Sequence, residues 1–326
     1  MRILVTGGAG FIGSNFIRYQ LENYDDQIIN VDKLSYAGNP DNLKDLESNS
    51  NYQFKQLDIC EKEKIDHLLH EGIDYIVNFA AESHVDRSIE DPSIFVKNNV
   101  EGTQNLLDLA LKFGVKKFVQ ISTDEVYGSL GEEGKFSEES PLNPSSPYSA
   151  SKAAADLLVS SYAKTYNLPV NISRCSNNFG PYQYPEKLIP LFIIRALHDK
   201  KLPLYGDGSN IRDWIYVKDH CRAVDLVMRR GKAGEIYNIG ADNEKSNLEI
   251  TKKILALLSK TELLIKYVED RRGHDYRYAV DSSKIKSELG WEAEFDFEKA
   301  METTLNWYLD HKEWWQKLIE AEDLEA

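Results

Sequence analysis

The sequence has few cysteines, no long apolar run and no excess of positive charge, and each absence excludes a class of protein. Its three cysteines, Cys60, Cys175 and Cys221, are odd in number and far apart. They therefore fit neither a disulfide framework nor a metal site with closely spaced ligands. Idle thiols of this kind are typical of a reducing cytoplasm. No apolar run approaches the roughly 20 residues that a membrane-spanning helix needs.

The net charge and the first residues of the chain exclude further classes of protein. A formal net charge of −14 argues against a nucleic-acid-binding surface, although a nucleotide ligand needs only a few local cations. The first ten residues, MRILVTGGAG, contain no basic segment followed by an apolar one, so we expect no signal peptide and a cytoplasmic location. A chain of 326 residues with 42% hydrophobic and 28% charged residues is typical of a globular protein with two lobes.

A glycine-rich turn lies between the first expected strand, at 2–6, and a helical pattern. Its glycines can be read as Gly8, Gly10 and Gly13 or as Gly7, Gly10 and Gly13, and either set lets backbone N–H groups approach a pyrophosphate. The next strand ends at Asp32, nineteen residues after Gly13. A carboxylate there accepts hydrogen bonds from ribose hydroxyls and repels a 2′-phosphate. The sequence therefore predicts NAD, rather than NADP, as the cofactor.

Strands and helices alternate along the first half of the chain. Further strands are expected at 27–31, 53–57, 75–80, 117–122 and 170–174, with helices at 62–69, 93–113 and 148–166. This alternation predicts an α/β fold with a doubly wound, Rossmann-like parallel sheet. In such sheets ligands lie at the carboxyl ends of the strands. The residues that fall at those ends are Asp32, Asp58, Ala80 and Thr123.

The alternation loosens after the sixth strand. Helices are expected at 188–198, 217–230, 248–258 and 297–310, and an acidic amphipathic helix from Trp314 onward. We interpret 1–174 as the cofactor-binding domain and 175–326 as a smaller α/β substrate-binding domain, with an interleaved boundary. The loop at 128–147 is rich in Gly, Pro, Ser and Glu and has no periodicity, which is the pattern of a mobile cover.

Tyr148 and Lys152 are four residues apart and share one face of the expected helix. An ammonium group near a phenol favours the phenolate and lowers its pKa from about 10. Such a pair can take a proton from a sugar hydroxyl while a hydride leaves the same carbon. The spacing alone is equally typical of an ordinary amphipathic helix, so its weight comes from the surrounding motifs.

Two adjacent acids, Asp124 and Glu125, follow the fifth strand. A general acid and a general base that act on neighbouring carbons would require two such groups. The alternative is a solvated acidic loop, which is common in a chain with 53 acidic residues.

Together these motifs resemble those of an extended short-chain dehydrogenase/reductase and, more narrowly, of the dTDP-glucose 4,6-dehydratases, along nearly the whole chain. The glycine motif and the Tyr-Lys pair indicate the superfamily, and the acid pair after Thr123 is the more specific element. The resemblance is carried by TGGAGFIGS at 6–14, DKLSYAGN at 32–39, AAESHVDRSI at 80–89, STDEVYG at 122–128, YSASKAAAD at 148–156, SNNFGPYQYPEKLIP at 176–190, YGDGSNIRDWIYVKDH at 205–220 and GHDYRYAVD at 273–281.

The resemblance implies a reaction in which hydride leaves a sugar carbon and returns to another. Tyr148, assisted by Lys152, removes the proton from glucose O4 as hydride passes from C4 to NAD, and Thr123 hydrogen-bonds O4. Glu125 then takes the C5 proton and Asp124 protonates the departing C6 hydroxyl. Hydride returns to C6, which gives a 4-keto-6-deoxy sugar.

The resemblance also implies the residues that bind cofactor and substrate. NAD is expected to contact Gly7, Gly10, Phe11, Ile12, Gly13, Asp32, Lys33, Ser35, Asp58, Ile59, Ala80, Ala81, Ser83, Asn99, Tyr148, Lys152 and Asn178. The nucleotide sugar is expected to contact His84, Thr123, Asn177, Lys187, Leu188, Tyr205, Arg212, Asn247, Arg271, Arg272 and His274. The family usually has proline where this chain has Arg272, so the phosphate-contacting arginine is Arg271, Arg272 or both.

Two alternatives share the fold. An NAD-dependent nucleotide-sugar epimerase or decarboxylase would need the Tyr-Lys pair but not both acids, and a non-catalytic NAD-binding regulator would need only the glycines. We expect no metal, no nucleic-acid partner and no membrane partner. We also expect a homodimer formed through the long helices that contain Leu106 and Leu157. The sequence leaves the choice among thymidine, uridine, cytidine and guanosine nucleotides open.

Overall fold

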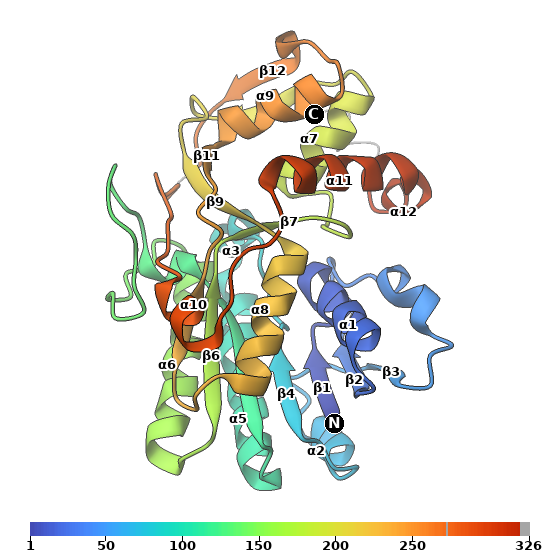
Figure 1. The fold of residues 1–326 in the computed structure, drawn as a ribbon, viewed down its shortest axis with the longest axis vertical. Coiled ribbons are helices and arrows are strands. Elements are labelled where there is room, and N and C mark those ends of the chain that lie inside the picture. Colours follow the sequence, from blue (N-terminus) through green and yellow to red (C-terminus); the bar gives the residue numbers. More distant parts are fainter. Residues whose placement is uncertain (272, 320–326) are drawn as a thin grey trace.

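A seven-stranded parallel sheet organises the computed structural model, which describes residues 1–271 and 273–319 (Figure 1). The strand order is β10-β6-β5-β4-β1-β2-β3, so the direction of winding reverses between β1 and β4. The predicted doubly wound sheet is therefore confirmed. The strands are β1 (Arg2–Thr6), β2 (Gln27–Asp32), β3 (Tyr52–Gln56), β4 (Tyr75–Asn78), β5 (Lys117–Thr123), β6 (Val170–Cys175) and β10 (Ile236–Ile239).

Helices cover both faces of this sheet, and the strand sequences explain why. Successive side chains of a strand point to opposite faces: Ile3 and Val5 join one hydrophobic cluster, whereas Leu4 joins another. Both faces are therefore apolar and both are buried. One face packs against α1 (Phe11–Asn23) and α8 (Val217–Arg230), and the other against α2 (Lys62–Leu69), α5 (Gly102–Phe113) and α6 (Pro147–Tyr166) (Figure 1).

The helix predicted at 93–113 is continuous but is not α-helical throughout. It begins as α4 (Pro92–Phe95), winds as a π-helix, η2 (Val96–Glu101), and ends as α5. Asp91 caps its start by accepting a hydrogen bond of 3.0 Å from the Ser93 N–H. Asn98 and Asn99, two consecutive residues in the wider π turn, are both buried. A regular period of 3.6 residues does not predict this π turn.

The second half of the chain forms a smaller lobe around a separate hydrophobic cluster. It contains a sheet of β11 (Glu244–Ser246), β9 (Ile211–Tyr216) and β7 (Asn177–Phe179), and a pair of β12 (Ile265–Val268) and β8 (Leu202–Tyr205). Its helices are α7 (Leu188–Leu197), α9 (Asn247–Leu257), α11 (Phe297–Asp310) and α12 (Lys312–Gln316). In contrast, α8, β10 and α10 (Ser283–Leu289) return to the large sheet, so the two parts of the chain are interleaved.

The remaining segments are short. They comprise α3 (Val85–Glu90) and the 3₁₀ helices η1 (Pro40–Leu46), η3 (Asp124–Tyr127) and η4 (Glu262–Leu264). The predicted cover at 128–147 is held by bridges from Leu130 to Arg277 and from Phe136 to Val280. In the predicted tail, Trp314 and Trp315 are buried, and residues 320–326 lie outside the described part.

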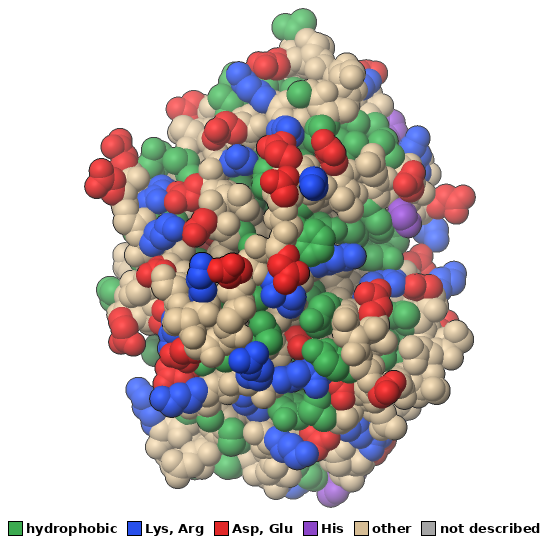
Figure 2. Space-filling view, in the orientation of Figure 1, with side chains coloured by type: hydrophobic (Ala, Val, Ile, Leu, Met, Phe, Trp, Pro, Cys, Tyr) green, Lys and Arg blue, Asp and Glu red, His purple; other side chains and the backbone are tan. Residues whose placement is uncertain are grey.

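The surface of the molecule is relevant to the predicted partners of the chain. Figure 2 shows acidic and basic side chains mixed over one face of the molecule. Leu106 is fully buried in the core of its own chain, whereas Leu157 is 61% exposed, so only the second of the two leucines is available to another molecule. Among the helices of residues 1–271 and 273–319, none has the length and apolarity required to cross a bilayer.

Candidate active site

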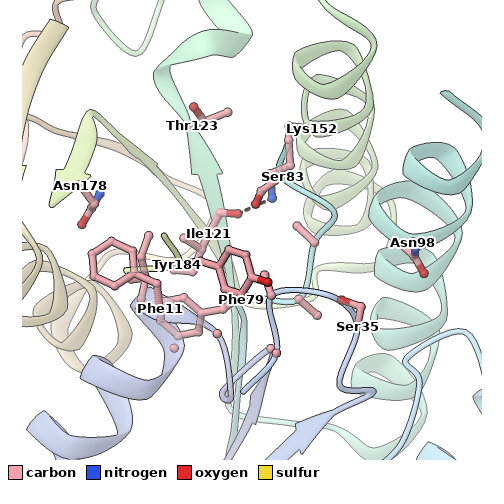
Figure 3. A pocket seen from close by; sticks show the side chains of 18 of the residues that line it. Phe11, Ser35, Phe79, Ser83, Asn98, Ile121, Thr123, Lys152, Asn178 and Tyr184 are labelled. Carbon is pink, nitrogen blue, oxygen red and sulfur yellow. Dashed lines mark hydrogen bonds between the residues drawn. The ribbon is translucent and has the colours of Figure 1, made fainter. Parts of the chain in front are cut away.

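A cavity of about 320 Å³ lies at the carboxyl ends of the central strands, where the sheet reverses its order (Figure 3). Most of the residues predicted to bind the cofactor or to act on the substrate line it. They are Gly7, Gly10, Phe11, Ile12, Gly13, Asp32, Lys33, Ser35, Asp58, Ile59, Ala80, Ala81, Ser83, Thr123, Asp124, Glu125, Tyr148, Lys152, Asn177, Asn178 and Lys187.

The other predicted residues are placed elsewhere. Asn99 lies behind the cavity wall, and Arg272 falls outside the described residues. The remaining predicted substrate-binding residues do not line this cavity and come from the second lobe and from the segment before α3. They are His84, Leu188, Tyr205, Arg212, Asn247, Arg271 and His274.

The glycine turn forms a cradle that only glycine permits. Gly7 has φ +70°, and a Cβ atom on it would lie 2.5 Å from the Ala80 nitrogen. A Cβ atom on Gly13 would lie 2.4 Å from the Gly7 oxygen. Gly8 instead packs against Asn30, away from the cavity. Of the two possible readings, the structure therefore places Gly7, Gly10 and Gly13 at the cavity, with backbone exposed at the start of α1 as a pyrophosphate requires.

Asp32 ends β2 at the cavity. Its carboxylate accepts hydrogen bonds from the Ala9 N–H at 3.0 Å and from the Leu34 N–H at 2.8 Å. Burial raises the pKa of Asp32, and these two hydrogen bonds oppose that effect. Each oxygen retains acceptor capacity for a further donor, so the residue fits a ribose hydroxyl.

Asn99 shapes the turn after β4 and does not face the cavity. Its side-chain oxygen accepts from the Glu82 N–H at 2.8 Å, and its nitrogen donates to the Glu82 carbonyl at 3.0 Å and to Ser151 Oγ at 2.8 Å. These bonds occupy the amide, and its neighbour Asn98 lines the cavity. The predicted contact between Asn99 and the cofactor stays a prediction.

The start of α6 fixes Tyr148 and Lys152. Ser146 caps the helix by accepting from the Ser149 N–H at 3.1 Å, and Ser149 Oγ accepts from the Ser146 N–H at 3.0 Å. Proline at 147 suits the first helical position. Both predicted residues are buried, and Lys152 Nζ donates to the Ile121 carbonyl at 2.6 Å (Figure 3).

Burial shifts the pKa values of Tyr148 and Lys152 in opposite directions. Burial raises the pKa of Tyr148 well above its usual value, and Glu125, Cys175 and Asp124 raise it further. Burial also lowers the pKa of Lys152. Lys152 is not among the main causes of the Tyr148 shift, and its Nζ donates to a backbone carbonyl. The predicted lowering of the Tyr148 pKa by Lys152 stays a prediction, and a positive charge near the phenol would act in the same direction.

Asp124 and Glu125 lie in different electrostatic surroundings. Burial raises the pKa of Asp124 well above its usual value, and the carboxyl groups of Glu125 and Asp213 raise it further. Burial also raises the pKa of Glu125, but three cations oppose this effect: Arg271, Arg212 and Lys187. The pKa values of both acids are therefore raised, and that of Asp124 is raised the more strongly. This difference favours Asp124 over Glu125 as the proton donor.

Local hydrogen bonds hold the two acids in place. Thr123 caps η3: its hydroxyl accepts from the Glu125 N–H at 3.2 Å and donates to Asp124 Oδ1 at 3.2 Å. The second oxygen of Asp124 has no hydrogen-bond partner among the described residues. That buried oxygen is available to a ligand.

The cations around Glu125 come from distant segments. Arg212 on β9 is buried, donates to the Asp275 carbonyl at 3.0 Å and lies over the Tyr278 ring at 4.4 Å. Lys187 donates to the Ser83 carbonyl at 3.2 Å. Arginine forks and lysine donors suit a diphosphate.

Several cavity residues were not predicted. Glu186 links two loops over the cavity: its carboxylate accepts from the Tyr36 hydroxyl at 3.0 Å and lies 3.5 Å from His84 Nε2. No periodicity signals its loop. Cys175 and Ser176 also line the cavity, and the strand-end rule that identified Thr123 would have identified them. Within residues 1–271 and 273–319 no cluster of three or more His, Cys, Asp or Glu side chains is arranged to hold a metal.

Known proteins share this arrangement. The family model described as GDP-mannose 4,6 dehydratase matches residues 4–304. The chain is 56% identical to the low-salt glycan biosynthesis protein Agl12 of Haloferax volcanii, over 96% of this chain and 100% of the relative. It is 47% identical to a dTDP-glucose 4,6-dehydratase of Escherichia coli, over 98% of this chain and 97% of the relative. The crystal structure of DesIV, a dTDP-glucose 4,6-dehydratase of Streptomyces venezuelae with NAD and TYD bound, superposes with a TM-score of 0.96 at 48% identity, over 98% of this chain and 100% of that one.

Proposed function

The chain belongs to the GDP-mannose 4,6 dehydratase family and, within it, to the dTDP-glucose 4,6-dehydratases, and from that membership we propose its reaction. It removes water from a nucleoside-diphosphate glucose, dTDP-glucose in particular, and yields the 4-keto-6-deoxy sugar with NAD as cofactor. The observation that carries this proposal is that the adjacent acids Asp124 and Glu125 line the same buried cavity as Tyr148 and Lys152.

The cradle and Asp32 fit NAD. The backbone at Gly7, Gly10 and Gly13 receives the pyrophosphate, and the Asp32 carboxylate receives a ribose hydroxyl. When bound, NAD supplies a hydride acceptor that carries positive charge. A positive charge beside Tyr148 favours its phenolate, against the burial that raises its pKa.

Tyr148 begins the reaction as the base. It takes the proton from sugar O4 as hydride leaves C4, and the Thr123 hydroxyl holds O4 by a hydrogen bond. Lys152, at the same buried wall, holds its proton against the Ile121 carbonyl and orients this end of α6. The product of the step is a ketone at C4.

Glu125 and Asp124 complete the elimination. A C5 proton is acidic only beside a carbonyl, so oxidation at C4 comes first. Glu125, whose pKa is lowered by three nearby cations against the effect of burial, takes the C5 proton. Asp124, whose pKa burial raises, gives its proton to the C6 hydroxyl, which leaves as water. Bound NAD would supply the hydride acceptor at C4 and, once reduced, the hydride donor at C6. Glu125 gives its proton back to C5 as C6 is reduced, which completes the 4-keto-6-deoxy sugar.

The diphosphate is held by the cations of the second lobe. Arg212 and Arg271 supply planar forks and Lys187 a point charge, all of which act on Glu125 as well. We propose that the remaining predicted residues contact the sugar and base. They are Asn177, which lines the cavity, and His84, Leu188, Tyr205, Asn247 and His274, which do not.

A panel of glucose nucleotides tests the proposal. The purified protein is incubated with the thymidine, uridine, cytidine and guanosine diphosphate sugars, and the products are weighed by mass spectrometry. Loss of one water from the thymidine nucleotide is expected. An unchanged mass with inverted stereochemistry would identify an epimerase, and loss of carbon dioxide from a uronic acid nucleotide would identify a decarboxylase.

We also propose that the protein acts as a homodimer in the cytoplasm. Support for the dimer comes from apolar side chains on the outer surfaces of α5 and α6, which contact each other: Leu111, Leu157 and Tyr166 are 38%, 61% and 52% exposed. Support for the compartment comes from Cys60, Cys175 and Cys221, which are all free thiols.

A further inference from the structure

A buried polar network connects the segment that carries the two acids to the helix that carries the tyrosine. Tyr127 is the last residue of η3, which contains Asp124 and Glu125, and its hydroxyl accepts a hydrogen bond of 2.9 Å from Arg174 NH1. Arg174 lies on β6, and its Nε donates to Asp156 Oδ2 at 2.9 Å. Asp156 is on α6, one turn after Lys152 and two turns after Tyr148. Three hydrogen-bonded side chains therefore join the two halves of the site.

The network extends to the loop that covers the site. The Tyr127 hydroxyl donates to Asn238 Oδ1 at 2.8 Å, and the Asn238 side-chain nitrogen donates to the Phe136 carbonyl at 3.0 Å. The guanidinium of Arg174 also lies over the Tyr127 ring, 4.9 Å from its centre. The Tyr127 hydroxyl thus uses both its donor and its acceptor capacity, and its position is fixed from two sides.

Stability of the fold alone does not explain the buried ion pair of Arg174 and Asp156. The side chains of Arg174 and Asp156 are only 4% and 1% exposed, and replacing such a pair by apolar residues is often neutral or stabilising. Geometry is the better explanation, because the planar fork of arginine reaches two partners at fixed angles. Asp156 also opposes the effect of burial on the pKa of Lys152.

We propose that Tyr127 and Arg174 are positioning residues that set the acids Asp124 and Glu125 against Tyr148 and Lys152, so that oxidation at C4 and elimination at C5 and C6 act on one bound sugar. This inference rests on the proposed function. It assigns a role to residues that do not line the cavity themselves.

Tyr127→Phe tests the inference, with Tyr237→Phe as its matched control. Tyr237 on β10 is also fully buried, and its hydroxyl also has two partners: it donates to Glu288 at 2.9 Å and accepts from the Lys232 N–H at 3.1 Å. Each variant loses one buried hydroxyl. The NAD-loaded proteins are mixed with dTDP-glucose, and reduced nicotinamide, dehydrated product and thermal midpoint are followed.

If Asp124 and Glu125 are displaced, elimination should slow more than oxidation does. Tyr127→Phe is expected to lower formation of dehydrated product about 10- to 100-fold, to leave the first oxidation within about threefold, and to accumulate reduced nicotinamide. Tyr237→Phe is expected to lower the thermal midpoint to a similar extent with turnover within about twofold. Arg174→Lys, which keeps the charge but not the fork, is expected to behave as Tyr127→Phe does.

The outcomes separate the inference from the proposed function. If Tyr127→Phe slows oxidation and elimination equally, or changes turnover no more than Tyr237→Phe does, the inference is wrong while the function stands. If the wild-type protein releases no dehydrated product from any glucose nucleotide, both are wrong.

Discussion

Glu125 illustrates, at the scale of one residue, how neighbours determine chemistry. Burial raises its pKa, whereas Arg271, Arg212 and Lys187 oppose that effect and favour the carboxylate. A glutamine at this position has the same shape and cannot accept a proton. We expect Glu125→Gln to keep slow oxidation at C4 but to lower water loss about 10²- to 10⁴-fold, seen as reduced nicotinamide that persists without dehydrated product.

The control for this variant is Glu132→Gln, which removes an exposed acid of the covering loop and should leave both steps unchanged. Rapid full turnover by Glu125→Gln would assign the proton acceptor to another group.

A second prediction at the scale of one residue concerns the buried side chain of His220. Burial lowers its pKa from 6.5 to about 3; its Nδ1 lies 3.0 Å from Asn178 Oδ1, and its Nε2 has no hydrogen-bond partner among the described residues. A histidine with a lowered pKa in the folded state stabilises the fold above pH 6.5 and loses that contribution as the pH falls toward 3. At about 1.4 kcal/mol per pKa unit, the loss approaches about 5 kcal/mol.

Thermal or denaturant unfolding between pH 7 and pH 4 measures the part of this loss that falls above pH 4, about 3 kcal/mol at about 1.4 kcal/mol per pKa unit. Wild type should lose stability relative to His220→Gln, whose amide can still donate to Asn178 but does not titrate. Since all other groups titrate in both proteins, parallel pH curves would show that His220 does not carry the effect.

At the scale of elements, α12 supports the glycine turn from the other end of the chain. Trp314 Nε1 donates to Asn42 Oδ1 at 2.9 Å, and the Asn42 side-chain nitrogen donates to the Ala9 carbonyl at 2.9 Å. Ala9 in turn donates to Asp32. We expect Trp314→Phe, which keeps an aromatic ring but removes the donor, to cost about 1 to 2 kcal/mol of stability and to speed NAD release several-fold.

Trp315→Phe is the matched control because Trp315 lies on the same helix and its Nε1 donates to the Tyr308 carbonyl at 2.8 Å. It should cost similar stability and leave the rate of NAD release, followed by fluorescence of the reduced cofactor, unchanged. Equal release rates in both variants would limit α12 to a role in packing.

The elements also show what the sequence can and cannot predict. Six of the seven strands of the large sheet, and α6, follow from the alternation of apolar segments, and the structure places Tyr148 and Lys152 on the same helix as predicted. The seventh strand, β10, was not predicted, because it lies beyond the regular alternation. The π turn before α5 could not be predicted, because periodicity assumes 3.6 residues per turn. The hydrogen bonds by which Asn99 holds the turn after β4 could not be predicted either, because they join residues that no local pattern connects.

At the scale of the whole molecule, the site combines segments that no local pattern connects. Glu186 and the cations around Glu125 come from loops and from a small sheet, and only the resemblance to a family pointed to Arg212 and Lys187. The Tyr148 pKa could not be predicted from spacing either. It depends on burial and on carboxyl groups from another segment, so it is a property of the assembled fold.

The proposed dimer depends on which side of each helix faces outward. On α6 the inward face carries Tyr148, Lys152 and Asp156, whereas Leu157 is 61% exposed on the other side. Burying a leucine contributes about 1.5 to 3 kcal/mol, and an unpaired carboxylate at the same place opposes association. Leu157→Glu should therefore convert a dimer into a monomer, measured as a halved mass in solution scattering.

Leu263→Glu, which changes a 78% exposed leucine of η4, is the control and should leave the mass unchanged. A dimeric Leu157→Glu variant would place the dimer contact elsewhere, and a monomeric wild type would show that there is no dimer. Because α6 carries Tyr148, the proposed base, on its inward face, loss of the dimer should also lower turnover, whereas the Leu263 variant should retain it.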